Sequence, residues 1–354
     1  MKYEAKAWKE TEGACLRNFK EQAQIDSVNG ALALRSQIEK IIDQIWEEGF
    51  DGIYFIGIGG TYASSMQVEV YMRGRSKLPV FVENAAEFLT TGNKKFTNKS
   101  VVIISSVSGN TKEMVELVDR VHEKGAKVFS FIDNPGTILT QPNKQDYLIV
   151  YPMNEQLKFY MVANYLMYKN GEFDDYDRYN KEMEANLADV LVQVEKDSDE
   201  WAYAYAKNKV AFWKEHKDLP HYFIGSGNQY GATYSYAMCY WEEQMWIRTK
   251  SISCQEFFHG MQEIIVEDTP VTLFMGEDEQ RPLAERVAKF LPRVNANYTI
   301  IDTKEHELKG ISPEFRGTIS HLVMHGVNNR VDAYMELFLR HPLSIRRYYR
   351  QFDY

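Results

Sequence analysis

An apolar strand that ends in glycines occurs twice in this sequence and constrains the fold more than any other feature. It reads Phe55-Ile56-Gly57-Ile58-Gly59 in the first half and Phe223-Ile224-Gly225-Ser226-Gly227 at an offset of 168 residues (223 minus 55). A strand, a glycine turn and a helix in succession open many α/β units. The repetition predicts a tandem duplication, and 354 residues are enough for two domains.

Apolar runs alternate with helical stretches in both halves. The runs cover residues 52–58, 79–82, 101–105 and 128–132, and then 221–224, 270–274 and 298–301. This alternation predicts a parallel sheet with helices on both faces in each half. Residues 174–217 are rich in charge, with Ala, Leu and Val at helical spacing, which predicts a helical connector. The first forty residues also read as helix.

Composition and spacing exclude several classes of protein. A net charge of −9 argues against a general nucleic-acid surface. There is no apolar run long enough to span a membrane, and residues 1–6 lack the pattern of a signal peptide, so we expect a cytoplasmic protein without membrane contact. The cysteines, Cys15, Cys239 and Cys254, have neither disulfide nor zinc spacing, and we expect them to be reduced.

No cofactor or metal is expected. The two glycine turns place Tyr62 and Tyr230 where the dinucleotide pattern G-x-G-x-x-G requires its third glycine. His321 and His325 are four residues apart, but no Glu lies between them to complete a zinc-protease motif.

The strand at 101–105 leads into the hydroxyl-rich turn Ser106-Val107-Ser108-Gly109-Asn110-Thr111. Apolar residues then recur at helical spacing, at Met114, Leu117, Val118 and Val121. The hydroxyls therefore lie where a helix begins, and free N–H groups attract an anion there. They can bind a phosphate or simply cap the helix. Thr61, just past the first glycine turn, can add another hydroxyl at the same edge of the sheet.

Acid and base candidates lie in the second half. Glu243 falls within Tyr240–Trp246, a segment compatible with a helix, and the sequence Glu256-Phe257-Phe258-His259-Gly260 follows. Apolar surroundings can tune a carboxylate and a histidine for proton transfer near neutral pH. The alternative is that both glutamates face solvent and His259 is a satisfied core residue.

Together these pieces resemble the tandem sugar isomerase (SIS) domains of glucosamine 6-phosphate synthase and of the fructosamine 6-phosphate deglycases. Gly59-Gly60-Thr61-Tyr62 is similar to the family's Gly-Thr-Ser-Tyr segment, and residues 106–111 resemble its Ser-x-Ser-Gly-x-Thr loop, with Val107 in place of the synthase's Gln. Residues 256–260 resemble its Glu-x-x-His-Gly. The family's catalytic Glu stands sixteen residues before that His, and here that position is Glu243. The ending His341–Tyr348 resembles the deglycases more than the synthase.

The resemblance implies an α/β fold of two tandem SIS domains, each a flavodoxin-like three-layer α/β/α unit. We expect an N-terminal helical extension at 1–34, the domains at 35–172 and 201–335, a helical connector at 173–200 and a C-terminal tail near the active site at 336–354. The implied activity is cleavage of a 6-phosphorylated fructosamine, an Amadori product, to glucose 6-phosphate and an amine. The alternatives are an isomerase or aminating enzyme acting on fructose 6-phosphate, and a non-catalytic sugar-phosphate sensor.

The resemblance also assigns roles. Gly60, Thr61, Ser106, Ser108 and Thr111 would bind the sugar phosphate. Glu243 would move the proton and His259 would assist ring opening, while Glu256 would orient His259 or the amine. In the family the His comes from the neighbouring subunit, so a homodimer with shared active sites is implied.

Overall fold

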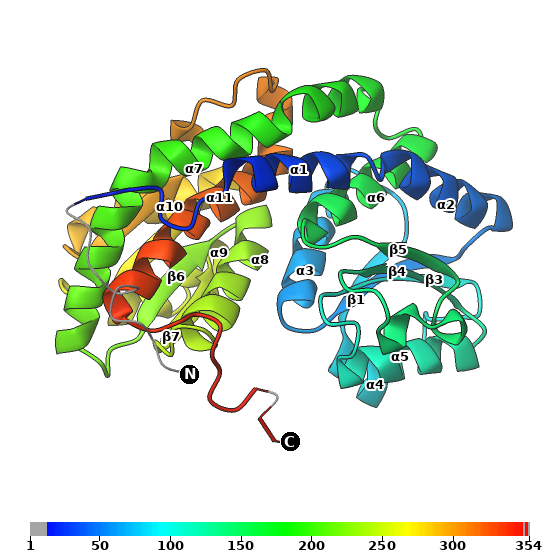
Figure 1. The fold of residues 1–354 in the computed structure, drawn as a ribbon, viewed down its shortest axis with the longest axis horizontal. Coiled ribbons are helices and arrows are strands. Elements are labelled where there is room, and N and C mark those ends of the chain that lie inside the picture. The colour runs from blue at the N-terminus through cyan, green and yellow to red at the C-terminus, as the bar shows by residue number, and fades with distance from the viewer. Residues whose placement is uncertain (1–12, 350, 353–354) are drawn as a thin grey trace. The chain divides into compact units, whose positions relative to one another are not determined.

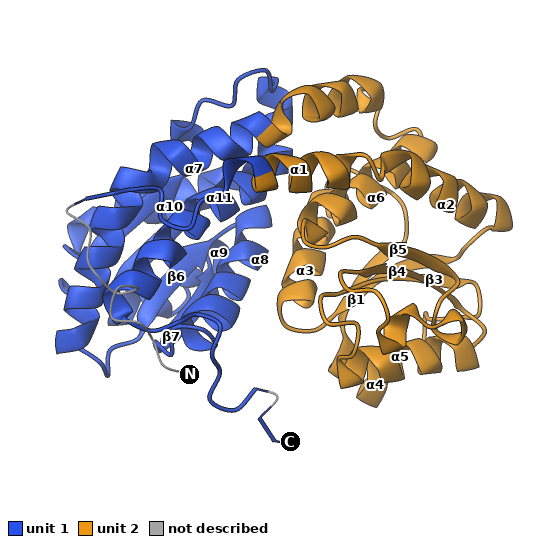
Figure 2. Cartoon of the chain, viewed as in Figure 1, with its two compact units in different colours: residues 1–22, 189–354 blue, residues 23–188 orange. Residues whose placement is uncertain are grey.

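The computed structural model describes residues 13–349 and 351–352. They form two compact units, one of residues 23–188 and one of the described residues up to 22 together with those from 189 onward (Figure 2). The division falls inside the helix α7, Tyr176–Glu215, so most of residues 174–217 are helical, as predicted. The domain boundaries given above stay a prediction.

The unit of residues 23–188 is built on a parallel sheet of five strands in the order β2-β1-β3-β4-β5 (Figure 1). Its strands are β1 Gly52–Gly57, β2 Val80–Asn84, β3 Ser100–Ser106, β4 Lys127–Ile132 and β5 Tyr147–Val150. The helices before α7 are α1 Glu21–Leu32, α2 Arg35–Glu48, α3 Gly60–Arg73, α4 Ala85–Thr91, α5 Lys112–Glu123 and α6 Glu155–Lys169.

Burial on both faces of this sheet explains its apolar strands. Every residue of β1 and β3 is buried. On one face α4 and α5 complete an apolar core with the sheet, and α3 packs against β1, β2 and α6. The four apolar positions predicted from helical spacing, Met114, Leu117, Val118 and Val121, are all buried, as predicted. Hydrophobic burial of this kind is the main stabilising term for a parallel sheet.

The other unit repeats the design with a parallel sheet of four strands in the order β7-β6-β8-β9. Its strands are β6 His221–Gly225, β7 Thr249–Ser253, β8 Val271–Met275 and β9 Tyr298–Asp302. Its helices are α8 Asn228–Ser235, a π-helix at Tyr236–Glu242, α9 Cys254–Phe257, α10 Arg281–Phe290 and α11 Pro313–Leu339. In each sheet, counted in chain order, the second strand pairs with one side of the first strand and the third strand pairs with its other side. This is the flavodoxin-like order. The predicted fold class, two three-layer α/β units, is confirmed.

Three details differ from the prediction. Residues 13–20 are not helical, and Leu16 and Asn18 have positive φ values of 49° and 59°, which a helix excludes. The expected helix at Tyr240–Trp246 is also wrong, because helical structure ends at Glu242. Strands β5 and β7 were not predicted. Residues 1–12 lie outside the described residues.

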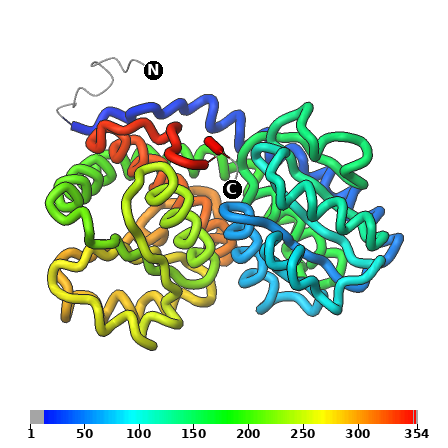
Figure 3. Tube along the Cα trace, turned by 90° about the horizontal axis from the view of Figure 1, so that it is seen from below, coloured from blue at the N-terminus to red at the C-terminus, as the bar shows by residue number. Residues whose placement is uncertain are grey.

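Within the described ranges, no helix is both long and apolar enough to cross a membrane. After α11 the chain continues into a C-terminal segment that belongs to the same unit as β6 to β9, red in Figure 3.

Candidate functional site

The sheet of residues 23–188 has a topological switch point between β1 and β3. The chain leaves β1 toward β2 on one side and leaves β3 toward β4 on the other, so the two connections diverge at the carboxyl ends of these strands. Ligands of open α/β sheets bind in the crevice formed there. The glycine turn at 57–60 follows β1 and the hydroxyl-rich loop at 106–111 follows β3. All five residues predicted to bind the phosphate therefore lie at this switch point.

Hydroxyl groups hold both connections in shape. Thr61 Oγ1 accepts a hydrogen bond from the backbone N–H of Ile58 at 3.0 Å and donates to the Ile58 carbonyl at 3.1 Å. Ser106 Oγ accepts from the N–H of Gly109 at 3.1 Å. The hydroxyls of Ser108 and Thr111 lie 3.3 Å apart, at the start of α5. These two hydroxyls stand side by side where the positive end of the helix attracts an anion.

The segment after β4 holds the loop at 106–111 in place through hydrogen bonds. Asn134 Nδ2 donates to the carbonyl of Val107 at 2.6 Å, and the N–H of Ile138 donates to Asn110 Oδ1 at 2.9 Å. Gly109 has a φ of 62°, and a Cβ at this position would overlap the hydroxyl of Thr137. Glycine is therefore required there for backbone angle and for space.

Buried charges lie next to this loop, at the start of α6. Lys158 has no exposed surface, and its Nζ donates to the Tyr151 carbonyl at 2.8 Å and lies 3.5 Å from Asp133 Oδ1. Burial lowers the pKa of Lys158, and the Asp133 carboxylate opposes that shift. Burial also raises the pKa of Glu155, against the effect of the neighbouring Ser64 and Ser105 hydroxyls. The sequence carried no motif for these groups.

The matching switch point of the second sheet is filled by the protein's own side chains. The N–H of Asn228, the first residue of α8, donates to Asp278 Oδ2 at 2.6 Å, and a Cβ on Gly227 would overlap this carboxylate. In contrast, no described atom lies within 4 Å of a Cβ placed on Gly59 in the first glycine turn. The duplicated turns have diverged: the Asp278 carboxylate lies against the second, whereas the space beside Gly59 in the first is clear of described atoms.

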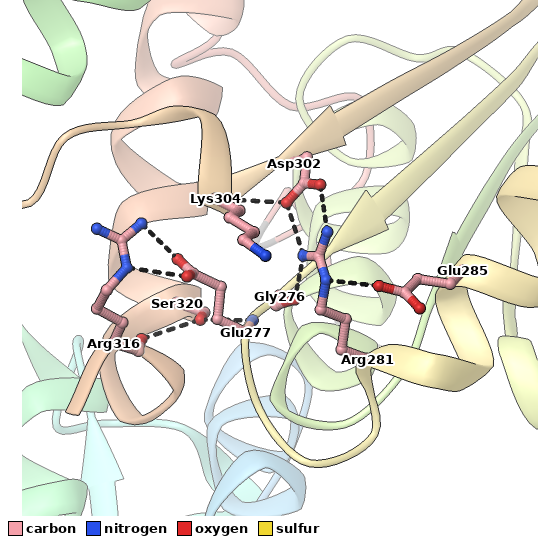
Figure 4. A network of polar contacts seen from close by, with 8 residues as sticks. All are labelled: Gly276, Glu277, Arg281, Glu285, Asp302, Lys304, Arg316 and Ser320. Carbon is pink, nitrogen blue, oxygen red and sulfur yellow. Dashed lines mark hydrogen bonds and ion pairs between the residues drawn. The ribbon is translucent and has the colours of Figure 1, made fainter. Parts of the chain in front are cut away.

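Ion pairs reinforce the carboxyl edge of the second sheet (Figure 4). Arg281 donates to both carboxylate oxygens of Asp302, at 2.8 and 2.6 Å, and Arg316 donates to both oxygens of Glu277, at 2.9 and 2.8 Å. Bidentate pairs of this kind fix geometry as well as charge. The four side chains of these two pairs hold this part of the edge together.

Glu243 lies at the opposite edge of the second sheet. It follows the π-helix directly, and its N–H donates to the carbonyl of Met238, five residues back, at 3.0 Å. The neighbouring Glu242 accepts hydrogen bonds from the N–H and the hydroxyl of Thr249, the first residue of β7. Short π-helices recur at functional sites because they shift the side chains that follow.

A cavity of about 720 Å³ opens beside Glu243. Its wall is formed by Glu243 and Trp246 on one side and by the C-terminal residues Arg346, Arg347 and Tyr348 on another. Arg346 Nε donates to Glu243 Oε1 at 2.6 Å, and the two side chains are 20% and 35% exposed. The carboxylate is thus partly sheltered, paired and adjacent to a space that can hold a small molecule.

His259 and Glu256 lie elsewhere in the same unit. Both are exposed, and they follow the carboxyl end of β7, whereas Glu243 precedes its amino end. A five-residue strand is about 16 Å long. Among the described residues, no hydrogen bond or ion pair joins the His259 or Glu256 side chain to Glu243, so one chain does not bring its predicted base and its predicted histidine together.

Sequence reasoning missed several residues that shape these sites, among them Asp278, Thr137 and Arg346. For the segment that holds the loop at 106–111 in place, the local signal in the sequence is an Asn-Pro-Gly turn at 134–136. Within residues 13–349 and 351–352, no group of three or more His, Cys, Asp or Glu side chains is arranged to hold a metal ion.

The chain is similar to known proteins that are named as deglycases and phosphosugar isomerases. The SIS domain family model matches residues 50–168. Fructosamine deglycase FrlB of Bacillus subtilis (strain 168) is 26% identical over 90% of this chain and 97% of its own length. Fructoselysine 6-phosphate deglycase of Escherichia coli (strain K12) is 21% identical over 88% of this chain and 89% of its own.

A solved structure is similar to this chain as well. A protein of Salmonella typhimurium LT2 assigned as a phosphosugar isomerase has 25% identity and a TM-score of 0.83, covering 90% of this chain and 97% of that one. The fold, the strand order and the sequence matches point the same way: residues 50–168 match a SIS domain, and the two parallel α/β units fit a tandem pair of SIS domains.

Proposed function

We propose that this protein is a deglycase that converts a 6-phosphorylated fructosamine to glucose 6-phosphate and a free amine. The observation that carries the proposal is the pairing of an open, hydroxyl-rich switch point with a sheltered glutamate in a chain similar over most of its length to FrlB. The hydroxyl-rich switch point suits the binding of a phosphate, and the sheltered glutamate suits the removal of a proton from carbon.

The phosphate would bind at the switch point between β1 and β3. We assign the direct contacts to the hydroxyls of Ser108 and Thr111 and to the turn at Gly60, because the positive ends of α3 and α5 meet there. The hydroxyls of Thr61 and Ser106 also hold their own turns in shape, as the hydroxyl of Ser108 does by accepting from the N–H of Asn110 at 3.2 Å.

Glu243 would act as the base that moves a proton between two carbons. It removes a proton from C1, next to the C2 carbonyl, and the electron pair forms the C1=C2 bond of an enaminol. Return of the proton to C2 gives an imine at C1. Water adds to that imine and the C1–N bond breaks, which releases the amine and leaves the aldehyde of glucose 6-phosphate.

His259 would assist ring opening, and Glu256 would orient it or the amine. Because Glu243 and His259 lie at opposite ends of β7 in one chain, we propose that the histidine comes from a second copy, as the family resemblance implies. The working unit is then a homodimer with shared active sites, and its small-molecule partner is the sugar phosphate.

The test is glucose 6-phosphate release from a panel of 6-phosphorylated fructosamines of lysine, asparagine and glycine, with fructose 6-phosphate plus ammonia for comparison. We expect release from at least one fructosamine, and we expect Glu243→Gln to lower kcat by on the order of a hundredfold or more, since the amide cannot accept the proton. Glu242→Gln is the matched control, because it changes the adjacent carboxylate and keeps an oxygen for Thr249.

Equal activity of the Glu243→Gln and Glu242→Gln variants would refute the assignment of the base. Turnover of fructose 6-phosphate with ammonia alone would indicate an aminating enzyme instead. Tight binding of a hexose 6-phosphate without any turnover would indicate a sensor.

A further inference from the structure

The C-terminal segment 341–349 is docked against the residues that follow the π-helix. His341 Nε2–H donates to the carbonyl of Gln244 at 2.9 Å, and the His341 ring lies 4.1 Å from the ring of Trp246. The guanidinium of Arg347 lies 4.1 Å from the same indole. Burial lowers the pKa of His341, so the ring that contacts Trp246 is neutral near pH 7.

These contacts hold a strained residue. Trp246 has a φ of 61°, in the left-handed region that is unfavourable for a residue other than glycine. Aromatic and cation–π contacts to His341 and Arg347 offset that cost. The C-terminal segment and the Glu243–Trp246 turn therefore support each other.

Arg346 connects this segment to Glu243. Its Nε donates to Glu243 Oε1, while its Nη1 donates to the carbonyls of Leu343 at 2.6 Å and Ile345 at 3.0 Å. Hydrogen bonds to two backbone carbonyls thus hold the guanidinium in the position from which it pairs with the Glu243 carboxylate. An exposed ion pair of two free side chains contributes little, but this pair is partly buried and its cation is held in place.

We propose that Arg346 is the positioning residue of Glu243, an inference that rests on the proposed function. By holding Oε1, it fixes the carboxylate plane and leaves Oε2, which makes no hydrogen bond to another described residue, to accept the proton from C1. Proton transfer from carbon depends steeply on such placement, because the oxygen must stay within reach of the reacting hydrogen. Arg346 itself takes no proton.

The kinetic test compares Arg346→Gln, Arg346→Lys and Arg73→Gln in glucose 6-phosphate release by the full-length enzyme. Arg73, the last residue of α3, carries the same charge and pairs with Glu69 at 2.7 Å, and the two side chains are 65% and 39% exposed. We expect Arg346→Gln to lower kcat about tenfold or more with KM changed less than twofold, Arg346→Lys to recover part of the loss, and Arg73→Gln to match the parent. Equal kcat values for Arg346→Gln and Arg73→Gln would overturn the proposal, as would a loss confined to KM.

A second measurement does not depend on turnover. Hydrogen–deuterium exchange of the peptide covering 341–349 is compared in the parent, Glu243→Gln, Arg346→Gln and the double variant. We expect each single change to speed exchange severalfold and the double variant to add nothing further, because both remove one interaction. Unchanged exchange in both single variants would overturn the proposal. A parent that shows this coupling but releases no glucose 6-phosphate would instead refute the deglycase function.

Discussion

At the scale of single residues, Gly109 is the most constrained position in the candidate phosphate loop. Its φ of 62° and its contact with Thr137 leave no room for a side chain. We expect Gly109→Ala to displace the loop and to raise KM for the phosphorylated substrate about tenfold, with a smaller effect on kcat. Gly136→Ala is the matched control, because Gly136 has a similar φ of 73° but no atom within 4 Å of an added Cβ. Steady-state kinetics of both variants separate the effect of the clash with Thr137 from the effect of backbone strain. Equal KM values for the two variants would show that the clash at Gly109 does not shape the loop.

At the scale of elements, a buried acid joins α11 to the π-helix that precedes Glu243. Asp332 accepts a hydrogen bond from the Tyr236 hydroxyl at 2.8 Å, and burial raises its pKa to about 7, against the effects of that bond and of Arg330. The native carboxyl keeps its proton up to about pH 7, whereas the unfolded one releases it near pH 4. Its contribution to stability therefore falls as pH rises from about 4 to 7, by at most about 1.4 kcal/mol per pH unit, and is constant above.

Asp332→Asn should remove this dependence. We expect the variant to gain stability relative to the parent as pH rises from 4 to 7, with the largest gain above pH 7, measured by thermal unfolding across that range. Asp189→Asn, at an exposed position on α7, is the control and should follow the parent at every pH. A difference between Asp332→Asn and parent that does not change with pH would show that the acid is ionised throughout.

The elements also show why part of the fold was predictable. Strands that are buried on both faces, such as β3, have long apolar runs that reveal them in the sequence. Strand β7 was missed because it lies at the edge of its sheet and reads Thr-Lys-Ser-Ile-Ser, with little burial to enforce apolar residues. The segment Tyr240–Trp246 is not helical to its end, because helical structure stops at Glu242 and Trp246 has a positive φ, with contacts to the distant C-terminal segment at His341 and Arg347.

The candidate site could likewise be predicted only in part. The loop at 106–111 could be placed because its strand, turn and helix are consecutive in sequence. The partners that shape the sites are distant: Arg346 lies 103 residues beyond Glu243, and Asp278 lies 50 residues beyond Asn228. No local pattern encodes such pairs, since they arise only when the sheet brings separate connections to one edge.

At the scale of the whole molecule, the separation of Glu243 and His259 along β7 makes a distinct prediction about assembly. If each site takes Glu243 from one copy and His259 from the other, a dimer of one Glu243→Gln chain and one His259→Ala chain has one site with both changes and one site with neither. Such a mixed dimer should recover about half of the parent activity, although each homodimer is nearly inactive. Co-expression with two different affinity tags isolates the mixed dimer, and glucose 6-phosphate release measures it. If instead each chain supplied both residues to its own site, every site in the mixed dimer would carry one change, and activity would stay at the level of the homodimers.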